Sequence, residues 1–393
     1  MTIKLMCTWA FEKQIKKFDK AEMLFKNSLQ RKEMGLHIHS IIIRKLKTIC
    51  GVWEFKKIRY RNKNKNIIYY DNPHFQIEKH KNIDSNLKKD ILEKIRNRLT
   101  YENVIKSYPK NTISIFSIRQ IIKKSFIDKN QKTTVFKKIE NEKNIYIEMD
   151  DTYAKLQWNS KNKKYLNRLV VIHTGLDNKR NVKNKTILIE TKNTDSSKIS
   201  VNQWVEIIKT KIKELYKFNY KNIIVIGDGA TFIKKIAQKL NAKYIIDSWH
   251  LKKILQKLVG YGLYSRKNKH FFKWFNIQNK VTIYKFCEKE IMKGNYALVL
   301  DVIYEAIQFT KTQNHNVDLS MKLQEFYNFS KYVENNKQGI QNFAKNFYIG
   351  SRTEAFVANI IKKKIKRFTK IGLNLYKFLI YSGKKNNENL FFI

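Results

Sequence analysis

The 393-residue sequence is 42% hydrophobic and 13% aromatic, enough to build the cores of two or three domains, which excludes a disordered chain. Its 80 Lys and Arg against 33 Asp and Glu give a formal net charge of +47, which predicts a polyanionic partner. Abundant Lys, Asn, Ile, Tyr and Phe with only two prolines are also typical of an A+T-rich coding sequence, which explains part of this charge.

The three cysteines, Cys7, Cys50 and Cys287, lie far apart without companion histidines, so neither a disulfide framework nor a zinc site is expected. The first residues lack the continuous apolar core and cleavage site of a signal peptide, and no apolar run approaches membrane-spanning length. These features predict a soluble cytoplasmic protein with neither a membrane nor a small-molecule substrate as its partner.

The first 84 residues are expected to form a basic region of helices and one β-hairpin. The segment Phe11–Lys47 has helical spacing and contains no proline. In Val52–Arg61 aromatic residues alternate with charged ones, and an apolar run follows a polar turn, which predicts a hairpin. Its basic residues, including Arg59 and Arg61, could bind phosphates, and its aromatic residues could stack on bases. A half-buried hairpin with solvated lysines is the alternative.

Residues 85–128 are predicted to form three helices, with a short break at Pro109–Thr112 that makes the last two resemble a helix-turn-helix. One face of the last helix carries Ile115, Ile118, Ile121 and Ile122. The opposite face carries Arg119, Gln120 and Lys123, which would contact DNA if this helix entered the major groove. Helix pairs of this kind also occur in domains that bind nothing, so both alternatives stay open.

After a charged linker, the pattern over residues 144–252 changes to that of an α/β domain. We expect strands at Asn144–Met149, Leu169–His173 and Thr186–Glu190, a helix at Val201–Phe218 and a strand at Ile223–Ile226. Three antiparallel strands, a crossing helix and a parallel strand make the order of a ribonuclease H-like core. An all-α insertion over residues 253–345 would interrupt this core before the chain returns at residues 346–393.

Asp228 follows the buried strand Ile223–Ile226 and stands between Gly227 and Gly229. It therefore lies at the carboxyl end of a parallel strand, where functional groups gather in such sheets. A helix at Ala230–Leu240 and a second strand follow, which completes a strand, helix, strand pattern. The alternative is that Asp228 only caps this helix.

Two further carboxylates join Asp228 as candidate site residues: Asp150 at the end of the first strand and Glu354 at the start of a late helix. In a ribonuclease H-like core these positions are adjacent, and carboxylates without cationic partners repel one another unless a divalent metal binds. Two Mg²⁺ or Mn²⁺ ions about 4 Å apart would activate an attacking oxygen and stabilise a leaving oxygen in phosphodiester chemistry. Alternatively, Asp150 and Asp151 end a strand in an ordinary turn, and Ser351–Glu354 form a capping box.

Asp247 and His250 follow the second parallel strand and are interpreted as residues that start the next helix. The alternative gives Asp151, Asp247 and His250 a supporting role around a metal. The late segment Asn359–Lys370 is predicted to be a very basic helix. Its Lys362, Lys363, Lys366 and Arg367 would contact DNA phosphates.

Three blocks of the sequence resemble, in order, the signature blocks of the ISLre-type insertion-sequence transposases: YIEMDDTYAKLQ, then VIGDGATFIK with YIIDSWHLKK, then YIGSRTEAFVANIIKKKIK. These transposases are relatives of the Mutator-like DDE transposases and include transposase-like proteins of integrative conjugative elements. The resemblance runs from about Gly51 to about Lys366. By position it implies catalytic roles for Asp150, Asp228 and Glu354.

The same resemblance places the family's acid-x-x-His motif on Asp247 and His250. Asp151 stands where many relatives have glycine, which leaves open which of the adjacent acids, Asp150 or Asp151, binds metal. The implied activity is metal-dependent hydrolysis at the ends of a DNA element and attack of a 3′-hydroxyl on target DNA, by a dimer or larger assembly at the nucleoid. The alternatives are a catalytically silent DNA-binding protein derived from a transposase and a ribonuclease H-like nuclease.

Overall fold

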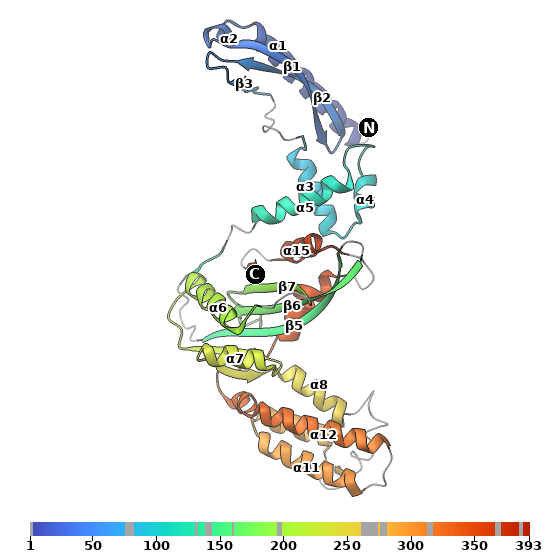
Figure 1. Ribbon diagram of the computed structural model, residues 1–393, viewed down its shortest axis with the longest axis vertical. Coiled ribbons are helices and arrows are strands. Elements are labelled where there is room, and N and C mark those ends of the chain that lie inside the picture. Colours follow the sequence, from blue (N-terminus) through green and yellow to red (C-terminus); the bar gives the residue numbers. More distant parts are fainter. Residues whose placement is uncertain are drawn as a thin grey trace. The chain divides into compact units, whose positions relative to one another are not determined.

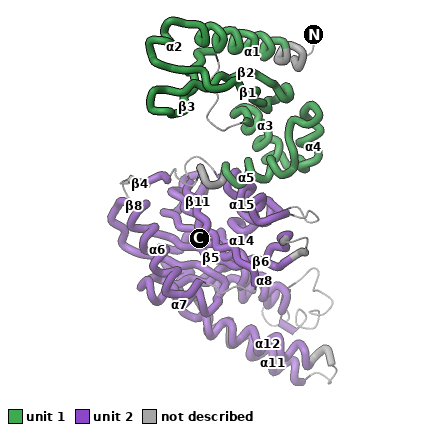
Figure 2. Tube along the Cα trace, turned by 45° about the horizontal axis from the view of Figure 1, so that its top comes forward, with its two compact units in different colours: residues 1–129 green, residues 130–393 purple. Residues whose placement is uncertain are grey.

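A computed structural model describes residues 3–74, 82–129, 133–137, 144–158, 161–194, 199–260, 274–275, 281–312, 317–365, 371–384 and 388–393. The chain divides into two compact units, residues 1–129 and residues 130–393 (Figure 2). Among the helices of these described ranges, none is both long and apolar enough to cross a bilayer.

Unit 1 begins with helices beside an antiparallel sheet (Figure 1). Its first elements are α1 (Ile3–Asn27), α2 (Leu29–Glu33), β1 (His37–Thr48), β2 (Gly51–Arg61) and β3 (Ile67–Tyr69). The described strands of this unit pair in the order β1-β2-β3, so the predicted hairpin is confirmed. Phe18 and Phe25 of α1 pack edge-on against Phe55 and Tyr60 of β2.

The prediction of helices over the whole of Phe11–Lys47 is wrong beyond Glu33. Gly35 ends the helical segment in a left-handed conformation, with φ of +62°, which few residues other than glycine adopt readily. The run Ile41–Ile43 that follows is β-branched and favours a strand. It lies in β1, which pairs with β2 along most of its length.

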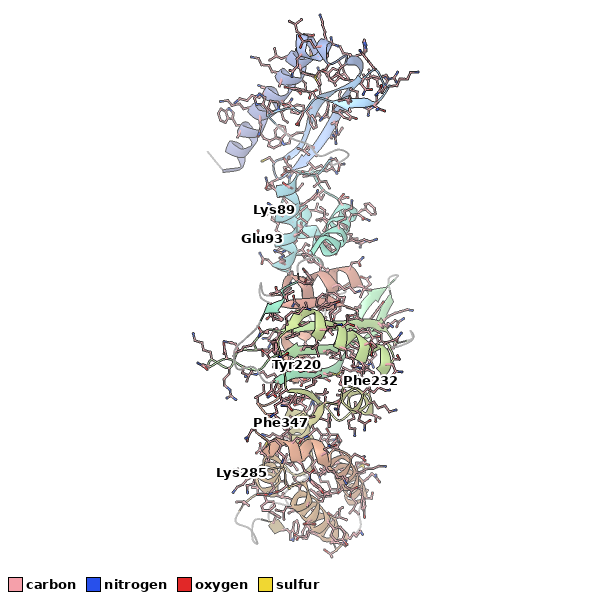
Figure 3. All side chains as sticks on the ribbon, turned by 90° about the vertical axis from the view of Figure 1, so that its left-hand side faces the viewer. Lys89, Glu93, Tyr220, Phe232, Lys285 and Phe347 are labelled. Carbon is pink, nitrogen blue, oxygen red and sulfur yellow. The ribbon has the colours of Figure 1, made fainter. Side chains whose placement is uncertain are left out.

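The three helices predicted after the hairpin are confirmed as α3 (Ser85–Arg96), α4 (Tyr101–Lys106) and α5 (Ile115–Lys129). Buried Leu87, Val104 and Ile118 pack them together, whereas Ile115, the first residue of α5, is 39% exposed. Figure 3 shows Lys89 and Glu93 on the outer face of α3. The use of α5 as a DNA-reading helix stays a prediction.

Unit 2 is a mixed α/β domain around one large sheet. Its strands are β5 (Asn144–Trp158), β6 (Lys161–His173), β7 (Thr186–Asn193), β9 (Asn222–Gly227), β10 (Lys243–Ile246) and β11 (Asn389–Phe392). In the described part of the chain they lie in the order β10-β9-β5-β6-β7-β11. β6 runs antiparallel to both of its neighbours, and the other adjacent pairs are parallel. β4 (Phe136–Lys137) and β8 (Tyr216–Lys217) form a separate short pair.

Helices cover both faces of the large sheet. They are α6 (Val201–Leu215), α7 (Thr231–Lys239), α14 (Thr353–Phe356) and α15 (Leu373–Ser382). α6 and α7 belong to one buried cluster, which includes Trp204, while α14 and α15 belong to another, which includes Phe356 and Tyr376. Burial on both sides explains why the central strands are nearly continuous apolar runs.

Three strands are several residues longer than predicted: β5, β6, which begins at Lys161 and not at Leu169, and β7, which ends at Asn193 and not at Glu190. β5 does not end at Met149 but continues to Trp158, because exposed Tyr153 and Lys155 alternate with buried Ala154 and Leu156, the period of a strand. β11 was not predicted at all, since a four-residue apolar run is too short to distinguish from a loop.

Between β10 and α14, the regular elements that the structure describes are helices, joined by turns and loops. These helices are α8 (Ser248–Val259), α10 (Ile283–Met292), α11 (Tyr296–Thr312), α12 (Val317–Asn335) and α13 (Lys337–Gln341). After α14, a π-helical turn over Val357–Ile361 and a 3₁₀ turn over Lys362–Lys364 follow. The late basic helix therefore begins at Thr353, before the predicted Asn359, and its predicted end at residues 366–370 lies outside the described residues.

Candidate active site

The register of two parallel strands brings Asp150 and Asp228 together. The last pair between β5 and β9 is Met149 with Gly227, so Asp150 and Asp228 are the next residue of each chain segment. A Cβ on Gly227 would lie 2.7 Å from the Ile233 side chain, and Gly229 has a φ of +96°. Only glycine fits both positions, and the chain can therefore turn sharply around Asp228.

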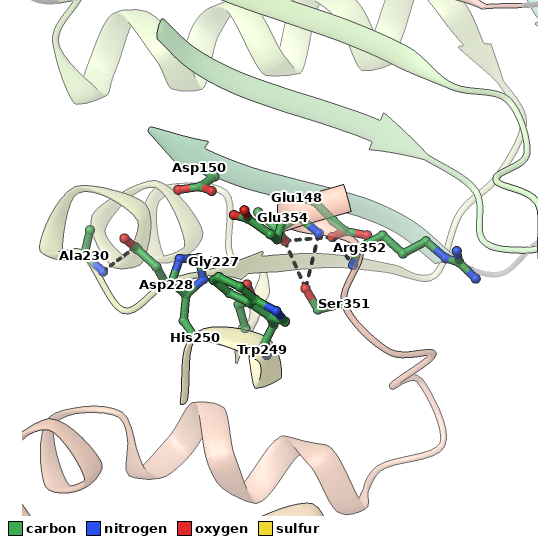
Figure 4. Close-up of polar contacts among 12 residues, drawn as sticks. Glu148, Asp150, Gly227, Asp228, Ala230, Trp249, His250, Ser351, Arg352 and Glu354 are labelled. Carbon is green, nitrogen blue, oxygen red and sulfur yellow. Dashed lines mark hydrogen bonds and ion pairs between the residues drawn. The ribbon is translucent and has the colours of Figure 1, made fainter. Parts of the chain in front are cut away.

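Asp228 is not the residue that caps α7. Its Oδ1 accepts a hydrogen bond from the Ala230 backbone N–H at 3.0 Å, but Ala230 itself precedes the helix without a side-chain cap (Figure 4). From the helical segment, the Tyr332 hydroxyl donates to the Asp228 backbone carbonyl at 2.6 Å. α12 thus holds the loop, and within the described part of the chain no hydrogen bond reaches the second carboxylate oxygen of Asp228.

Glu354 does not form the capping box. Arg352 precedes α14 without a side-chain cap, and the Glu354 carboxylate instead accepts from the Lys362 ammonium at 2.7 Å. Figure 4 shows Glu354 on the same side of β5 as Asp150. One ligand atom from each of Asp150, His250 and Glu354 lies within 4.8 Å of the others. The fold therefore joins residues that are far apart in the chain.

The electrostatics of this cluster are those of crowded carboxylates. Burial raises the pKa of Asp150 to about 6, and the charges of Asp228 and Glu354 add to this effect against the opposing charge of His250. Burial alone would lower the pKa of His250, but its hydrogen bond to Asp247 and the nearby Asp150 and Asp228 raise it overall. Carboxylate oxygens and an imidazole are donors that suit a divalent cation, so the residues fit a metal ion.

We expect the stability difference between Asp150→Asn and the natural protein to depend on pH when metal is chelated. Because folding raises the pKa of Asp150 to about 6, the unfolded chain loses this proton first as the pH rises. The free energy of unfolding therefore falls by about 3 kcal/mol between about pH 4 and pH 6. Asparagine has no such proton. Thermal unfolding should therefore show that the stability of the variant relative to the natural protein increases as the pH rises through this range. A stability difference between the two proteins that does not change with pH would contradict a raised pKa of Asp150.

Asp151 points away from this cluster. Its carboxylate accepts two hydrogen bonds from Arg168 of β6, at 2.8 and 2.7 Å, and the guanidinium of Arg168 lies 3.6 Å from the centre of the Phe232 ring on α7. Figure 3 labels Phe232. Because successive residues of a strand face opposite sides, Asp150 faces α14 and Asp151 faces α7. Of the two adjacent acids, Asp150 is the one that faces His250 and Glu354.

Replacing Asp151 by Asn should consequently have little effect on a reaction that depends on the carboxylate cluster. We expect any metal-dependent rate of Asp151→Asn to stay within about threefold of the natural protein, with a loss of stability of about 1 kcal/mol from the weakened Arg168 pair. Asp150→Asn in the same assay is the matched comparison. Equal loss of activity in both variants would show that the strand alternation does not separate their roles.

Glu148 anchors α14 to β5, a role that was missed in the sequence. This buried carboxylate accepts from the Arg352 backbone N–H at 2.7 Å and from the Thr353 hydroxyl at 2.8 Å, and it pairs with the buried His173 ring at 3.3 Å (Figure 4). The signal was available, since Glu148 is an acid inside an apolar strand and two residues before Asp150. That spacing puts both on one face of β5.

The residues predicted to contact DNA lie in both units. Arg61, Arg119 and Lys123 are exposed, while Arg59 and Gln120 are half-buried. Lys362 and Lys363 are exposed beside α14, but Lys362 pairs with Glu354. Lys366 and Arg367 lie outside the described residues.

A groove of about 470 Å³ opens beside Glu354. Its lining includes Trp249 of α8, Arg352 of the segment before α14, and Arg180 of the loop between β6 and β7. Trp249 is 40% exposed, and Arg180 is also exposed. An aromatic ring and guanidinium groups are the side chains that contact the bases and phosphates of a single strand.

Comparison with known proteins gives one family match. The sequence model of a family described as Uncharacterised protein family (UPF0236) matches residues 10–270, which is more than half of the chain. The match includes Asp150, Asp228 and His250 and ends before Glu354. No curated protein matches the chain.

Proposed function

The chain belongs to the UPF0236 family, which is associated with transposase-like proteins, and from this premise we propose that it is a metal-dependent DNA transposase of the DDE type, close to the ISLre-type enzymes. One observation carries the proposal. Asp150 and Asp228 follow paired positions of two strands, and Glu354 is held beside Asp150 although it lies far along the chain.

The strand order supports a ribonuclease H-like core for this enzyme. β5, β6 and β7 form an antiparallel meander, α6 follows, and β9 and β10 add in parallel beside β5. β11 extends the sheet at its far edge. The helical segment that includes α12 would be an insertion whose Tyr332 supports the Asp228 loop.

In this proposal Asp150, Asp228 and Glu354 hold a pair of divalent ions, Mg²⁺ or Mn²⁺. Such a pair, when bound, activates the attacking oxygen and stabilises the leaving oxygen of a phosphodiester. Lys362 exchanges its Glu354 partner for a DNA phosphate, and the exposed basic residues of both units bind DNA largely through its backbone. The protein works as a dimer or larger assembly on the element ends and the target.

The proposal is tested with the purified full chain and a linear DNA that carries its gene with the natural flanking sequences. We expect Mg²⁺ or Mn²⁺ to produce strand breaks with 3′-hydroxyl ends at two flanking positions, which sequencing of the products will locate. Joining of these ends to a second DNA would complete the reaction. Binding to the DNA without any cleavage in either metal would instead indicate a catalytically silent DNA-binding protein, and cleavage restricted to RNA·DNA hybrids would indicate a nuclease.

A further inference from the structure

His250 lies in the carboxylate cluster, and one of its two ring nitrogens, Nδ1, forms a hydrogen bond within the described part of the chain. Its Nδ1 lies 2.7 Å from Oδ2 of Asp247, and Oδ1 of Asp247 accepts from the Trp249 backbone N–H at 3.0 Å. Asp247 is fully buried, and its own N–H donates to the Gly227 carbonyl at 2.7 Å. Both the position of this carboxylate and the orientation of the His250 ring are therefore fixed.

The other ring nitrogen, Nε2, has no hydrogen-bond partner among the described residues. A ring nitrogen of His250 lies within 4.8 Å of one carboxylate oxygen each of Asp150 and Glu354. Ligand atoms that lie 2.0 to 2.2 Å from one metal ion are at most about 4.4 Å apart. Three atoms within 4.8 Å of one another lie at most about 2.8 Å from a common point, so side-chain shifts of up to about 0.8 Å would let all three side chains share a single ion, provided that Lys362 leaves Glu354.

We propose that His250 is a direct ligand of one metal ion, together with Asp150 and Glu354, and that Asp247 is its positioning residue. This inference rests on the metal site of the proposed function and makes it more specific. A carboxylate that hydrogen-bonds the second nitrogen of a ligating histidine fixes its tautomer and raises its basicity. The cluster has this arrangement, with Nδ1 held by Asp247 and Nε2 left for the metal.

The ligand set determines which cation the site prefers. Mg²⁺ favours oxygen ligands and keeps much of its water, whereas imidazole nitrogen suits divalent first-row transition ions. A site of two carboxylates and one imidazole should therefore bind Mn²⁺ more tightly than Mg²⁺. Replacing His250 should reduce the affinity for Mn²⁺ by about tenfold or more and that for Mg²⁺ much less, so the ratio of the two affinities reports the nitrogen ligand.

The test uses the full chain loaded with less than one equivalent of Mn²⁺ and requires no DNA cleavage. Pulsed electron paramagnetic resonance detects the nuclear spin of nitrogen bound to Mn²⁺. We expect nitrogen modulation in the natural protein, a change to the pattern of ¹⁵N when histidine is supplied as ¹⁵N-histidine, and loss of the modulation in His250→Gln. His39→Gln, at an exposed position of β1, is the matched control and should keep the signal.

The labelling experiment requires no variant, so Mn²⁺ bound without histidine nitrogen would overturn the inference even if His250→Gln fails to fold, whereas a histidine signal is assigned to His250 by its loss in the variant. Suppose that Mn²⁺ binds to the natural protein without any signal from histidine nitrogen, and that Asp150→Asn abolishes this binding. This result would overturn the inference but would support the proposed carboxylate site. Modulation that survives in folded His250→Gln would also overturn it. Absence of Mn²⁺ binding altogether would remove both the inference and the metal site of the proposed function. If Mn²⁺ binds through a nitrogen of His250 but the protein does not cleave DNA, the inference is upheld and the proposed function fails.

Discussion

Replacing Asp228 by Asn should reduce metal-dependent DNA strand cleavage by about a thousandfold or more, which corresponds to about 4 kcal/mol of lost transition-state stabilisation. Asparagine has the same shape and can still accept the hydrogen bond from Ala230, so the sharp turn should persist. What is lost is one negative charge that would hold the metal ion. Single-turnover cleavage of the natural flanking DNA measures the effect.

DNA affinity should respond differently to the same change. Because Asp228→Asn removes a negative charge from a basic protein, binding measured by fluorescence anisotropy should be unchanged or slightly tighter and should keep its dependence on salt. Asp301→Asn, at an exposed position of α11, controls for the change in net charge and should cleave normally. Cleavage by Asp228→Asn within tenfold of the natural rate would remove Asp228 from the proposed site.

Removal of the Glu148 carboxylate should destabilise unit 2 by about 3 to 5 kcal/mol. Glu148→Ala leaves buried His173, the Arg352 N–H and the Thr353 hydroxyl without their acceptor, and each such group carries a desolvation penalty. Chemical denaturation of the full chain, followed by tryptophan fluorescence, measures the loss. Glu206→Ala, at an exposed position of α6, should change the free energy of unfolding by less than about 0.5 kcal/mol.

The same variant tests whether Glu148 positions Glu354. Freed from this anchor, α14 should move away from β5, and the affinity for Mn²⁺ should fall even at temperatures where the protein remains folded. Glu148→Gln keeps an acceptor for the Arg352 N–H and should recover part of both properties. A Glu148→Ala protein with natural stability and natural metal affinity would show that α14 is held by its apolar contacts alone.

The meeting of Asp150 and Asp228 could be predicted from the sequence because it depends on local patterns. Both residues follow short, mostly apolar runs typical of strands, and parallel strands place their carboxyl ends at one edge of a sheet. The position of Glu354 is different, because it depends on how the chain returns over the sheet after a long helical segment. Glu354 could be proposed only from the expected core order and from the resemblance of its motif to a known family, because no local pattern separates it from a residue that caps a helix.

Other features of the site could not be read from spacing. Lys362 reaches Glu354 across eight positions because a π-helical turn, Val357–Ile361, intervenes, and nothing in the sequence marks that turn. The roles of Asp150 and Asp151 differ because β5 continues as a strand through both, which fixes the face of each residue. The sequence pattern predicts a helix where the structure has β1. The reason is that the β-branched run beyond Gly35 is short and its neighbouring residues are basic.

Asp150, Asp228 and Glu354 are proposed to form a catalytic metal site that acts on DNA. The most direct test is diffraction from crystals of the protein with its own flanking DNA and Mn²⁺, collected where manganese scatters anomalously. We expect two manganese peaks about 4 Å apart, bounded by these three carboxylates and next to a phosphodiester of the DNA. Well-ordered DNA at the site without manganese between the carboxylates, or manganese bound only elsewhere, would contradict it.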